Sequence, residues 1–183
     1  MKNRTKKNRP SKHTKMQYID ADYKNNNGML TQVWGPALWH FLHTMSFNYP
    51  VKPTATQKKQ YKDHVLSLQY VLPCGKCRDN LTQNFKELPL TDARLKSRET
   101  FSRYIYELHE HINKMLGKPS GLTFEQIRDR YENFRARCAG VGEIGCAMPM
   151  YSTKKRCVMR IVDADAEDCE SLTIDHSWEP FQR

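Results

Sequence analysis

The stretch WGPALWHFLHTM, residues 34–45, decides the fold class of this chain. Gly35 and Pro36 are typical of a helix start, because a proline in the first turn lacks only an amide that would be unpaired there. Apolar side chains then recur at helical spacing and form one face of the helix, at Leu38, Phe41, Leu42 and Met45. Trp39 and His43 are four residues apart and share a second strip of the same helix. An amphipathic helix with two chemically distinct faces is therefore expected here.

The same helical spacing recurs further along the chain. It predicts a second helix over 55–71, a third from Cys74 through about Phe85, and a fourth over about 98–116 that Gly117 ends as a C-terminal cap. The capping box Thr123-Phe-Glu-Gln126 opens a short fifth helix. The fold class predicted from this pattern is all-α, a four-helix bundle with a short fifth helix.

The composition divides the chain into three parts. Residues 1–30 are expected to be a disordered, basic N-terminal arm, and residues 31–138 are expected to form the helical bundle. Beyond Cys138 the helical pattern is lost. Residues 139–183 are therefore expected to form an irregular, cysteine-containing C-terminal extension, in which only 156–162 has a strand-like pattern.

The positive charge is concentrated in the N-terminal arm. The formal net charge is +10, and residues 1–16 carry seven lysines and arginines with no acidic residue, so about +3 remains for the rest of the chain. Such an arm is either simply solvated or makes weak contacts with polyanions such as nucleic acid, acidic proteins or anionic lipid. The arm has no apolar run typical of a signal peptide, and no stretch approaches the roughly 18 apolar residues that a membrane-spanning helix needs.

The motif with the clearest chemistry is Cys74-Gly-Lys-Cys77, which follows Pro73. Two thiols separated by two residues can close a small disulfide whose redox state is easily switched. At the start of a helix, the free amides and the positive end of the helix dipole stabilise a thiolate, and Lys76 and Arg78 add positive charge. The motif alone is also compatible with half of a zinc site. Six cysteines in a chain without a signal peptide favour redox chemistry or metal binding over a dense disulfide scaffold.

Further polar side chains on the helices could complete a cofactor site. His109 and Asn113 lie four residues apart on the fourth helix, and Lys118 follows its end. Together with Trp39 and His43, they offer aromatic faces, imidazoles, an amide and a cation that could hold a planar, phosphate-bearing cofactor between helices. Each residue also has a simpler interpretation, because a tryptophan near a helix start usually belongs to the core and a lone histidine is usually a surface or core residue.

Four blocks of sequence occur in an order and spacing that resemble a known family. They are WGPALWHFLH (34–43), Tyr49-Pro50, PCGKC (73–77), and HEHIN (109–113) with LGKP (116–119). Over residues 34–119 the chain resembles the FAD-linked sulfhydryl oxidases of the Erv/ALR family. The later stretches YENFRARC (131–138) and KKRCVMRIV (154–162) resemble the branch of that family encoded by large nucleocytoplasmic DNA viruses.

The resemblance implies a helical bundle, usually a homodimer, that binds FAD, oxidises protein thiols and passes the electrons to O2 to give H2O2. It implies that Cys74 exchanges disulfides with the substrate and that Cys77 lies against the flavin as the charge-transfer thiolate. The residues that it implies in cofactor binding are Gly35, Trp39, His43, Cys77, His109, Asn113, Lys118 and Tyr131.

The chain departs from the family pattern at two places. Many members carry a Gly-Arg pair where this chain has Gly35-Pro36, so one cationic contact is missing. Members often have a structural disulfide between the fourth helix and the segment after the Lys-Pro pair, whereas the corresponding residues here are Tyr106 and Leu122. The loss of this bond is expected to lower thermal stability rather than to abolish activity.

The remaining cysteines allow several arrangements. They are Cys138, Cys146, Cys157 and Cys169. Family members often use a second, flexible dithiol that shuttles electrons, and the glycine-rich loop between Cys138 and Cys146 suits this role. A structural disulfide that pins the extension is the alternative, and Cys157 and Cys169 could pair with each other or with either of the first two. Free thiols or a metal site are further options, although the spacings match no zinc pattern.

The function predicted from the sequence is an FAD-dependent thiol oxidase, with no metal, that forms disulfides in protein thiols. The expected substrates are virion proteins or a thioredoxin-like carrier, and the expected location is the cytoplasm or a viral assembly site, with the virion as a further location. One alternative is a non-catalytic, basic virion or nucleic-acid-associated protein with structural cysteines. Another is a zinc-binding protein that uses Cys74, Cys77 and two C-terminal cysteines. A thioredoxin-like exchanger without FAD is disfavoured, because no βαβ pattern surrounds the motif.

Overall fold

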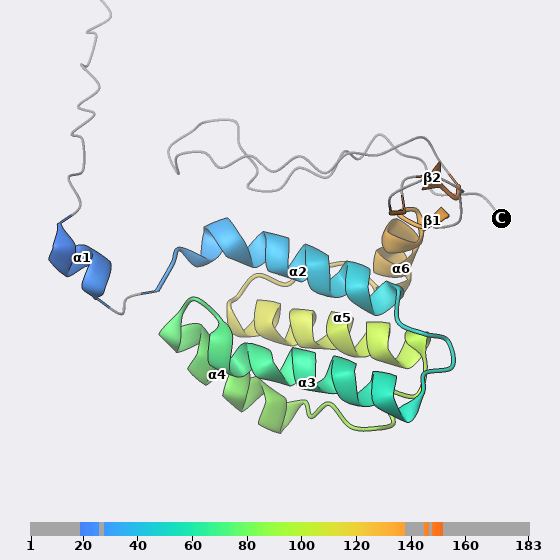
Figure 1. Ribbon diagram of the computed structural model, residues 1–183, viewed down its shortest axis with the longest axis horizontal. Coiled ribbons are helices and arrows are strands. Elements are labelled where there is room, and N and C mark those ends of the chain that lie inside the picture. The colour runs from blue at the N-terminus through green and yellow to red at the C-terminus, as the bar shows by residue number, and fades with distance from the viewer. Residues whose placement is uncertain (1–18, 26–27, 138–144, 147, 152–183) are drawn as a thin grey trace, which may run out of the picture.

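The computed structural model describes residues 19–25, 28–137, 145–146 and 148–151. The helices are α1 (Asp20–Lys24), α2 (Thr31–Phe47), α3 (Ala55–Val71), α4 (Gly75–Glu87), α5 (Arg98–Met115) and α6 (Phe124–Glu132). A short antiparallel pair of strands follows, β1 (Ala136–Arg137) and β2 (Met148–Pro149). The predicted all-α fold class is confirmed (Figure 1).

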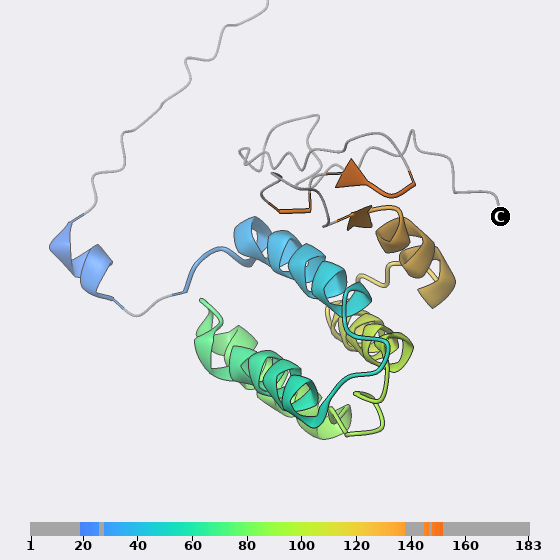
Figure 2. The ribbon, with the colours of Figure 1, turned by 45° about the vertical axis from the view of Figure 1, so that its right-hand side comes forward.

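Helices α2 to α5 form the bundle, and α6 lies at one end of it (Figure 1). The most closely packed pairs are α2 with α5 and α3 with α4. Figure 2 shows α3 and α4 side by side below α2. Helix α6 contacts both α2 and α5, so a second, smaller hydrophobic cluster forms where these three helices meet.

Large apolar and aromatic side chains fill the main core. The fully buried ones include Tyr49, Val65, Leu95, Phe101, Tyr104, Ile105 and Leu108. The Tyr49 hydroxyl donates a hydrogen bond to the Leu95 carbonyl at 2.9 Å, and the Tyr104 hydroxyl donates to the Leu88 carbonyl at 3.1 Å. These bonds pair polar groups inside the core and fasten the segment between α4 and α5.

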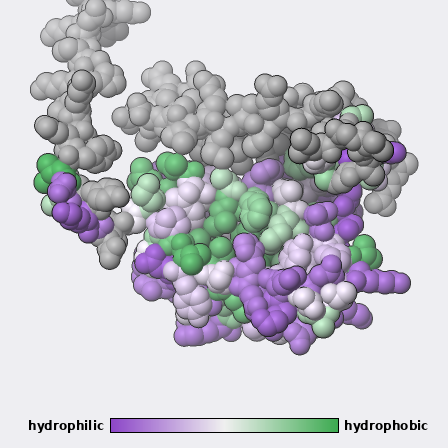
Figure 3. Space-filling model, in the orientation of Figure 1, coloured by the Kyte–Doolittle hydropathy of each residue, from purple (hydrophilic) through white to green (hydrophobic). Residues whose placement is uncertain are grey.

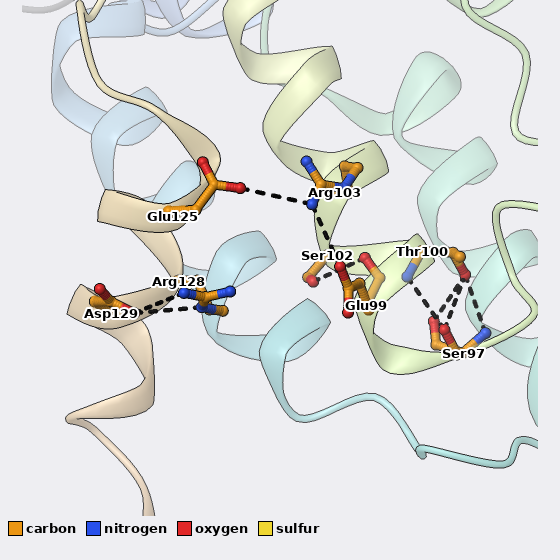
Figure 4. Close-up of polar contacts among 8 residues, drawn as sticks. All are labelled: Ser97, Glu99, Thr100, Ser102, Arg103, Glu125, Arg128 and Asp129. Atoms are coloured by element: carbon orange, nitrogen blue, oxygen red, sulfur yellow. Dashed lines mark hydrogen bonds and ion pairs between the residues drawn. The ribbon is translucent and has the colours of Figure 1, made fainter. Parts of the chain in front are cut away.

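Side-chain caps fix where three of the helices begin. The capping boxes are Thr54 with Gln57 before α3, Ser97 with Thr100 before α5, and Thr123 with Gln126 before α6. In each box the two side chains pair with each other's backbone amides, which would otherwise lack a partner. The predicted bounds of the second helix and the predicted box before the fifth are confirmed. Figure 4 shows the Ser97–Thr100 pair at the start of α5.

Arg103 joins α5 to the start of α6. Its guanidinium lies 3.3 Å from a Glu99 carboxylate oxygen on its own helix and 3.7 Å from a Glu125 oxygen on α6 (Figure 4). The same guanidinium lies 4.0 Å from the centroid of the Phe124 ring, within the range of a cation–π contact. One side chain thus holds the first turn of α6 against α5.

Tyr106 and Leu122 occupy the positions where many family members were expected to have a disulfide. The Tyr106 hydroxyl donates a hydrogen bond to the Leu122 carbonyl at 2.7 Å. The Tyr106 ring also packs edge-on against Phe124, with ring centroids 5.8 Å apart. A hydrogen bond and a ring contact therefore join the two segments in place of a covalent bond.

Two expectations about helix faces and ends were wrong. Helix α2 begins at Thr31, so Pro36 lies inside the helix rather than in its first turn. The helix tolerates this proline because the preceding Gly35 has no Cβ to clash with the ring, and the missing amide leaves one carbonyl, that of Gln32, without its helical partner. Phe41 and Met115 were expected in the core but are 52% and 47% exposed. Phe41 makes an edge-on contact with His64 of α3, with ring centroids 6.1 Å apart, and Met115 lines a cavity between α4 and α5, so neither side chain is enclosed.

The chain beyond α6 begins with the β1–β2 pair, which the sequence pattern did not predict. Ala136 pairs with Pro149 and Arg137 with Met148. Just before β1, an Arg135 guanidinium nitrogen donates a hydrogen bond to the Phe47 carbonyl at the end of α2, at 2.7 Å. This bond fastens the chain just after α6 to the end of α2. The strand-like stretch 156–162 lies outside the described residues.

Part of residues 1–30, which were expected to form a disordered arm, is ordered in the structure. Asp20–Lys24 are helical as α1, and the backbone of Met29 hydrogen-bonds to that of Pro73 in the bundle. Residues 1–18 lie outside the described part of the chain. Among the helices that the structure describes, none combines the length and apolar character needed to cross a bilayer.

Candidate redox and cofactor site

The two cysteines of the CxxC motif form a disulfide at the start of α4. Cys74 and Cys77 are bonded through their sulfurs, with Cα atoms 5.2 Å apart. Cys74 is the N-cap of α4, and the Cys77 amide donates a hydrogen bond to Cys74 Sγ at 3.2 Å. Both side chains are half-buried, so exposure alone does not separate their roles, but Cys77 packs against the main core. The disulfide therefore sits on the helix end that stabilises negative charge on Cys74.

The turn before the disulfide is held by hydrogen bonds to a single carbonyl. The Leu72 carbonyl accepts from the Cys74 amide at 2.8 Å and from the Arg78 guanidinium at 2.5 Å. Arg78, which was predicted as a source of positive charge, thus also orders the backbone that presents Cys74. Lys76 is exposed between the two cysteines.

Four predicted cofactor residues come together from three helices. His43 on α2 is only 3% exposed, and its Nε2 lies 3.0 Å from Nδ1 of His109 on α5. The Trp39 ring stacks on the His109 ring, with centroids 4.0 Å apart and planes 8° apart. The Tyr131 ring on α6 stacks on the His43 ring, with centroids 5.2 Å apart. The structure thus assembles Trp39, His43, His109 and Tyr131 into one aromatic cluster.

His40 belongs to this cluster, although the sequence pattern did not single it out. Its Nδ1 lies 3.3 Å from the Tyr131 hydroxyl oxygen, and its ring packs edge-on against Phe134 with centroids 6.0 Å apart. The partners lie on α6 and just after it, far away in the sequence. No local spacing signal could therefore have identified His40.

Burial keeps the imidazoles of the cluster neutral. It lowers the pKa of His43 to about 3, with smaller contributions from His109 and His40. Burial also lowers the pKa of His109 to about 4 and that of His40 below its ordinary value. It raises the pKa of the Tyr131 hydroxyl to about 12. At neutral pH the cluster is therefore uncharged, and one imidazole nitrogen of the His43–His109 pair donates while the other accepts.

The end of α5 brings the two remaining polar candidates close together. The Lys118 amide donates a hydrogen bond to the Asn113 carbonyl at 2.8 Å, across a turn in which Gly117 has a φ of 69°. The predicted glycine cap is thus confirmed, because this left-handed conformation favours glycine. The Lys118 side chain is exposed.

Glu110 orders this end of the helix and was missed by the sequence reasoning. Its carboxylate accepts a hydrogen bond from Asn113 Nδ2 at 2.8 Å and another from the Ser120 amide at 3.3 Å. Burial raises the pKa of Glu110, but the hydrogen bonds from Ser120 and Asn113 outweigh it and hold the pKa below its usual range. A carboxylate thus fixes both the Asn113 amide and the turn that carries Lys118.

Helix α2 connects the disulfide to the aromatic cluster. Thr31, its first residue, has Oγ1 3.7 Å from Cys77 Sγ. Trp39 lies eight residues further along the same helix, roughly 12 Å away at 1.5 Å per residue. Gly35 is buried between them, but a Cβ there would lie 3.5 Å from Thr31 Cγ2, an ordinary contact. The predicted role of Gly35 in cofactor binding therefore stays a prediction.

The arrangement fits an elongated cofactor that has flat rings and phosphates, as FAD does. The stacked Trp39 and His109 rings offer a flat aromatic surface. His43 Nδ1 is buried and has no hydrogen-bond partner in the described part of the chain, so a ligand could satisfy it. The exposed Lys118 cation suits a phosphate. The disulfide lies at the other end of the same helix.

A separate cavity of about 440 Å³ lies between α4 and α5. Its lining residues are Asn80, Gln83, Asn84, Glu87, His111, Lys114 and Met115. None of the residues predicted for the redox or cofactor site lines it, and it is not the site described above. We assign it no role.

The other cysteines are only partly described. Cys146 is disulfide-bonded, whereas Cys138, Cys157 and Cys169 lie outside the described residues. Over residues 19–25, 28–137, 145–146 and 148–151, no group of three or more His, Cys, Asp or Glu side chains is arranged to hold a metal ion. Zinc binding by Cys74 and Cys77 is not supported, because their sulfurs are bonded to each other.

Comparison with known proteins gives consistent matches. A sequence model of the Erv1 / Alr family matches residues 36–132, just over half of the chain. The chain is 39% identical to a probable FAD-linked sulfhydryl oxidase of Acanthamoeba polyphaga mimivirus, over 57% of this chain and 72% of that protein. It is 33% identical to an FAD-linked sulfhydryl oxidase of Arabidopsis thaliana, over 56% of this chain and 52% of that protein. The crystal structure of the FAD-binding domain of Erv1 from Saccharomyces cerevisiae superposes with a TM-score of 0.51 at 27% identity, covering 56% of this chain and 94% of that one.

Proposed function

This chain belongs to the Erv1 / Alr family, and from that premise we propose that it is an FAD-dependent thiol oxidase that works through the Cys74–Cys77 disulfide. The observation that carries the proposal is the position of this disulfide. It lies at the start of α4, within the residues that match the family, and α2 links it to a cluster of flat, neutral side chains.

In the proposed cofactor site, the aromatic cluster and the end of α5 bind FAD. The contacting residues would be Gly35, Trp39, His43, Cys77, His109, Asn113, Lys118 and Tyr131, with His40 as an addition from the structure. When bound, FAD would supply a group that accepts two electrons from a dithiol and reacts with O2, with H2O2 as the product. The hydrogen bond between His43 and His109 orients both imidazoles, and burial of His43 excludes water from that part of the site.

In the first step, a thiolate of the substrate attacks Cys74 Sγ. A bond forms between the two sulfurs, the Cys74–Cys77 bond breaks, and Cys77 Sγ leaves with the electron pair as a thiolate. The amide that donates to Cys74 Sγ and the start of α4 favour negative charge at the point of attack.

In the second step, a second thiolate of the substrate attacks the substrate sulfur that is bonded to Cys74 Sγ in the mixed disulfide. Cys74 Sγ leaves with that electron pair, and the substrate departs with a new disulfide. The substrate has lost two electrons and two protons, and Cys74 and Cys77 have gained the two electrons as a dithiol. With FAD held beside Cys77, Cys74 and Cys77 would give up these two electrons and two protons and return to the disulfide.

The substrates of such an oxidase are thiols, and its electron acceptor is O2. We infer further that the thiols belong to proteins, such as virion proteins or a thioredoxin-like carrier, because several relatives are encoded by large DNA viruses. On the same basis we place the protein in the host cytoplasm or at a viral assembly site, and in the virion. The basic residues before position 19 would add weak polyanion contacts.

We also infer a homodimer. Large apolar side chains are exposed on α2 and α3, with Phe41 52%, Val71 65% and Tyr70 73% exposed. Figure 3 shows apolar surface along α2. A second copy of the chain would cover such a surface. Light scattering of the purified protein tests this, and Phe41→Lys is expected to shift the mass toward that of the monomer.

The test of the proposed function is a visible absorption spectrum followed by oxygen consumption with dithiothreitol. We expect a flavin spectrum in the purified protein, and activity that is lost in Cys74→Ser and Cys77→Ser. Ser67→Ala, an unrelated hydroxyl on α3, should keep full activity. A protein that is colourless as purified and after incubation with FAD would overturn the proposal.

A further inference from the structure

The segment Gly28–Thr31 lies against the redox disulfide, although it precedes the residues that match the family. The Met29 amide donates a hydrogen bond to the Pro73 carbonyl at 2.6 Å, and the Met29 carbonyl accepts one from Trp34 Nε1 at 3.1 Å. The segment is therefore fastened to the turn before Cys74 on one side and to α2 on the other.

Gly28 permits this close approach. A Cβ at its position would lie 2.7 Å from the Pro73 carbonyl oxygen and 2.8 Å from Cys74 Cα. Both are backbone atoms of the turn that carries the disulfide, so a larger residue would force the segment away from it. The absence of a side chain is thus required for this contact.

Thr31 is the residue of this segment that reaches a reacting atom. Its Oγ1 lies 3.7 Å from Cys77 Sγ. Because a disulfide sulfur carries no hydrogen, the Thr31 hydroxyl is the donor. Thr31 is also the first residue of α2, so the helix fixes its backbone. The contact is therefore set by two structural elements that are far apart in the sequence.

The two cysteines differ in how they are stabilised as thiolates. The N-cap position and the Cys77 amide serve Cys74. Cys77 lies within the first turn of α4, where its own sulfur receives neither of these contacts. The mechanism nevertheless requires Cys77 to leave as the thiolate, and a leaving thiol with a lower pKa leaves faster. A separate donor at Cys77 would meet this need.

We propose that Thr31 is a further residue of the redox site, whose hydroxyl stabilises the Cys77 thiolate as the disulfide opens. The inference deepens the proposed function and rests on it for the direction of attack. When the substrate thiolate bonds to Cys74 Sγ, the electron pair of the broken bond passes to Cys77 Sγ, and Thr31 donates a hydrogen bond to it without giving up its proton. Gly28 and Met29 hold the segment in place for this contact.

The test compares Thr31→Val, which keeps the shape but removes the hydroxyl, with Thr31→Ser, which keeps the hydroxyl. The full-length protein is equilibrated without oxygen in dithiothreitol redox buffers, alkylated, and the peptide containing Cys74 and Cys77 is quantified by mass spectrometry. We expect Thr31→Val to lower the equilibrium constant for reduction by roughly three- to tenfold and to slow reduction by a similar factor. Thr31→Ser should stay within about twofold of the wild type.

Gly28→Ala provides an independent variant, because it keeps the hydroxyl but displaces the segment. It should shift the equilibrium in the same direction as Thr31→Val. The proposal is wrong if Thr31→Val has the wild-type equilibrium constant for reduction. It is also wrong if Thr31→Ser lowers this constant as much as Thr31→Val does. Circular dichroism reports whether each variant folds. If Thr31→Val does not fold, Thr31→Ala takes its place in the comparison.

This readout does not depend on oxidase activity. A wild-type protein that consumes no oxygen but shows the Thr31→Val shift would contradict the proposed function and leave the role of Thr31 standing. If the wild type consumes oxygen but Thr31→Val has the same equilibrium constant for reduction as the wild type, the proposed function stands and the role of Thr31 is wrong.

Discussion

His43 combines the burial of a core residue with a polar atom that is open to a ligand in the proposed site. It is nearly inaccessible, it shares a hydrogen bond with His109, and its second nitrogen has no partner in the described residues. A buried nitrogen without a partner destabilises a fold. Retaining one beside stacked rings is therefore more consistent with a binding site than with a core histidine, which was the simpler interpretation of the sequence.

The neutral His43–His109 pair couples stability to pH. Burial lowers the pKa of His43 from 6.5 to about 3 and that of His109 to about 4, so the unfolded chain takes up protons at these residues first as the pH falls. The folded state is therefore favoured most above pH 6.5, and this stabilisation is lost progressively below it, down to about pH 4 for His109 and about pH 3 for His43. We expect the melting temperature to fall across this window, and less steeply in His43→Gln.

Thermal scans at several pH values measure this slope. His64→Gln is the matched control, because His64 is exposed on α3. It should keep the wild-type slope. If the melting temperatures of the wild type and His43→Gln fall equally steeply with pH, the buried His43 does not couple stability to pH.

Tyr106 supports a second prediction for a single residue. Its hydroxyl donates to the Leu122 carbonyl, at the place where relatives were expected to have a disulfide. Tyr106→Phe keeps the ring contact with Phe124 and removes only this hydrogen bond. We expect a loss of about 1 kcal/mol in the free energy of unfolding by urea. Tyr70→Phe changes an exposed ring and should have no effect, and an equal loss in both variants would show that the bond to Leu122 contributes nothing.

At the scale of helices, the end of α5 depends on one carboxylate. Glu110 accepts from both Asn113 and the Ser120 amide, so it fixes an amide and a cation-bearing turn together. In Glu110→Gln, only the amide oxygen can accept a hydrogen bond, so either the Asn113 side chain or the Ser120 amide loses its partner. We expect the dissociation constant for FAD to rise about five- to tenfold, because Asn113 and Lys118 are no longer held in position.

Fluorescence titration of FAD into the apoprotein measures this change. Glu125→Gln makes the same substitution in an ion pair on α6 and should leave FAD binding unchanged. If the two variants bind FAD equally well, Glu110 does not order the site.

The helices themselves could largely be predicted from the sequence. Spacing gave the bounds of α3, and the Thr123–Gln126 box gave the start of α6, since both signals are local. Phe41 was misplaced because spacing identifies an apolar face but not what covers it. His40 and Thr31 were missed for a related reason: their partners, Tyr131 and Cys77, are distant in the sequence, and only the packing of helices brings them together.

At the scale of the whole molecule, the chain after α6 is fastened to the end of α2 and then forms a strand pair. The Arg135 guanidinium donates to the Phe47 carbonyl at the end of α2, and β1 pairs with β2 soon after. Cys146 lies just before β2 and is disulfide-bonded. The β1–β2 pair holds the residues that follow Cys146 beside β1, and a disulfide tethers Cys146 itself, whereas a dithiol that shuttles electrons needs a segment that can move.

We therefore expect the Cys146 disulfide to be structural. Cys146→Ser should lower the melting temperature by several degrees, because removing a disulfide releases conformational freedom in the unfolded chain. Oxygen consumption with dithiothreitol and with a reduced protein substrate should both stay within about twofold of the wild type, since electron transfer through Cys74 and Cys77 is unaffected. Cys77→Ser, the matched loss of a disulfide inside the bundle, should abolish both activities. A Cys146→Ser enzyme that keeps its activity with dithiothreitol but loses it with the protein substrate would instead show that this cysteine carries electrons from the substrate to Cys74.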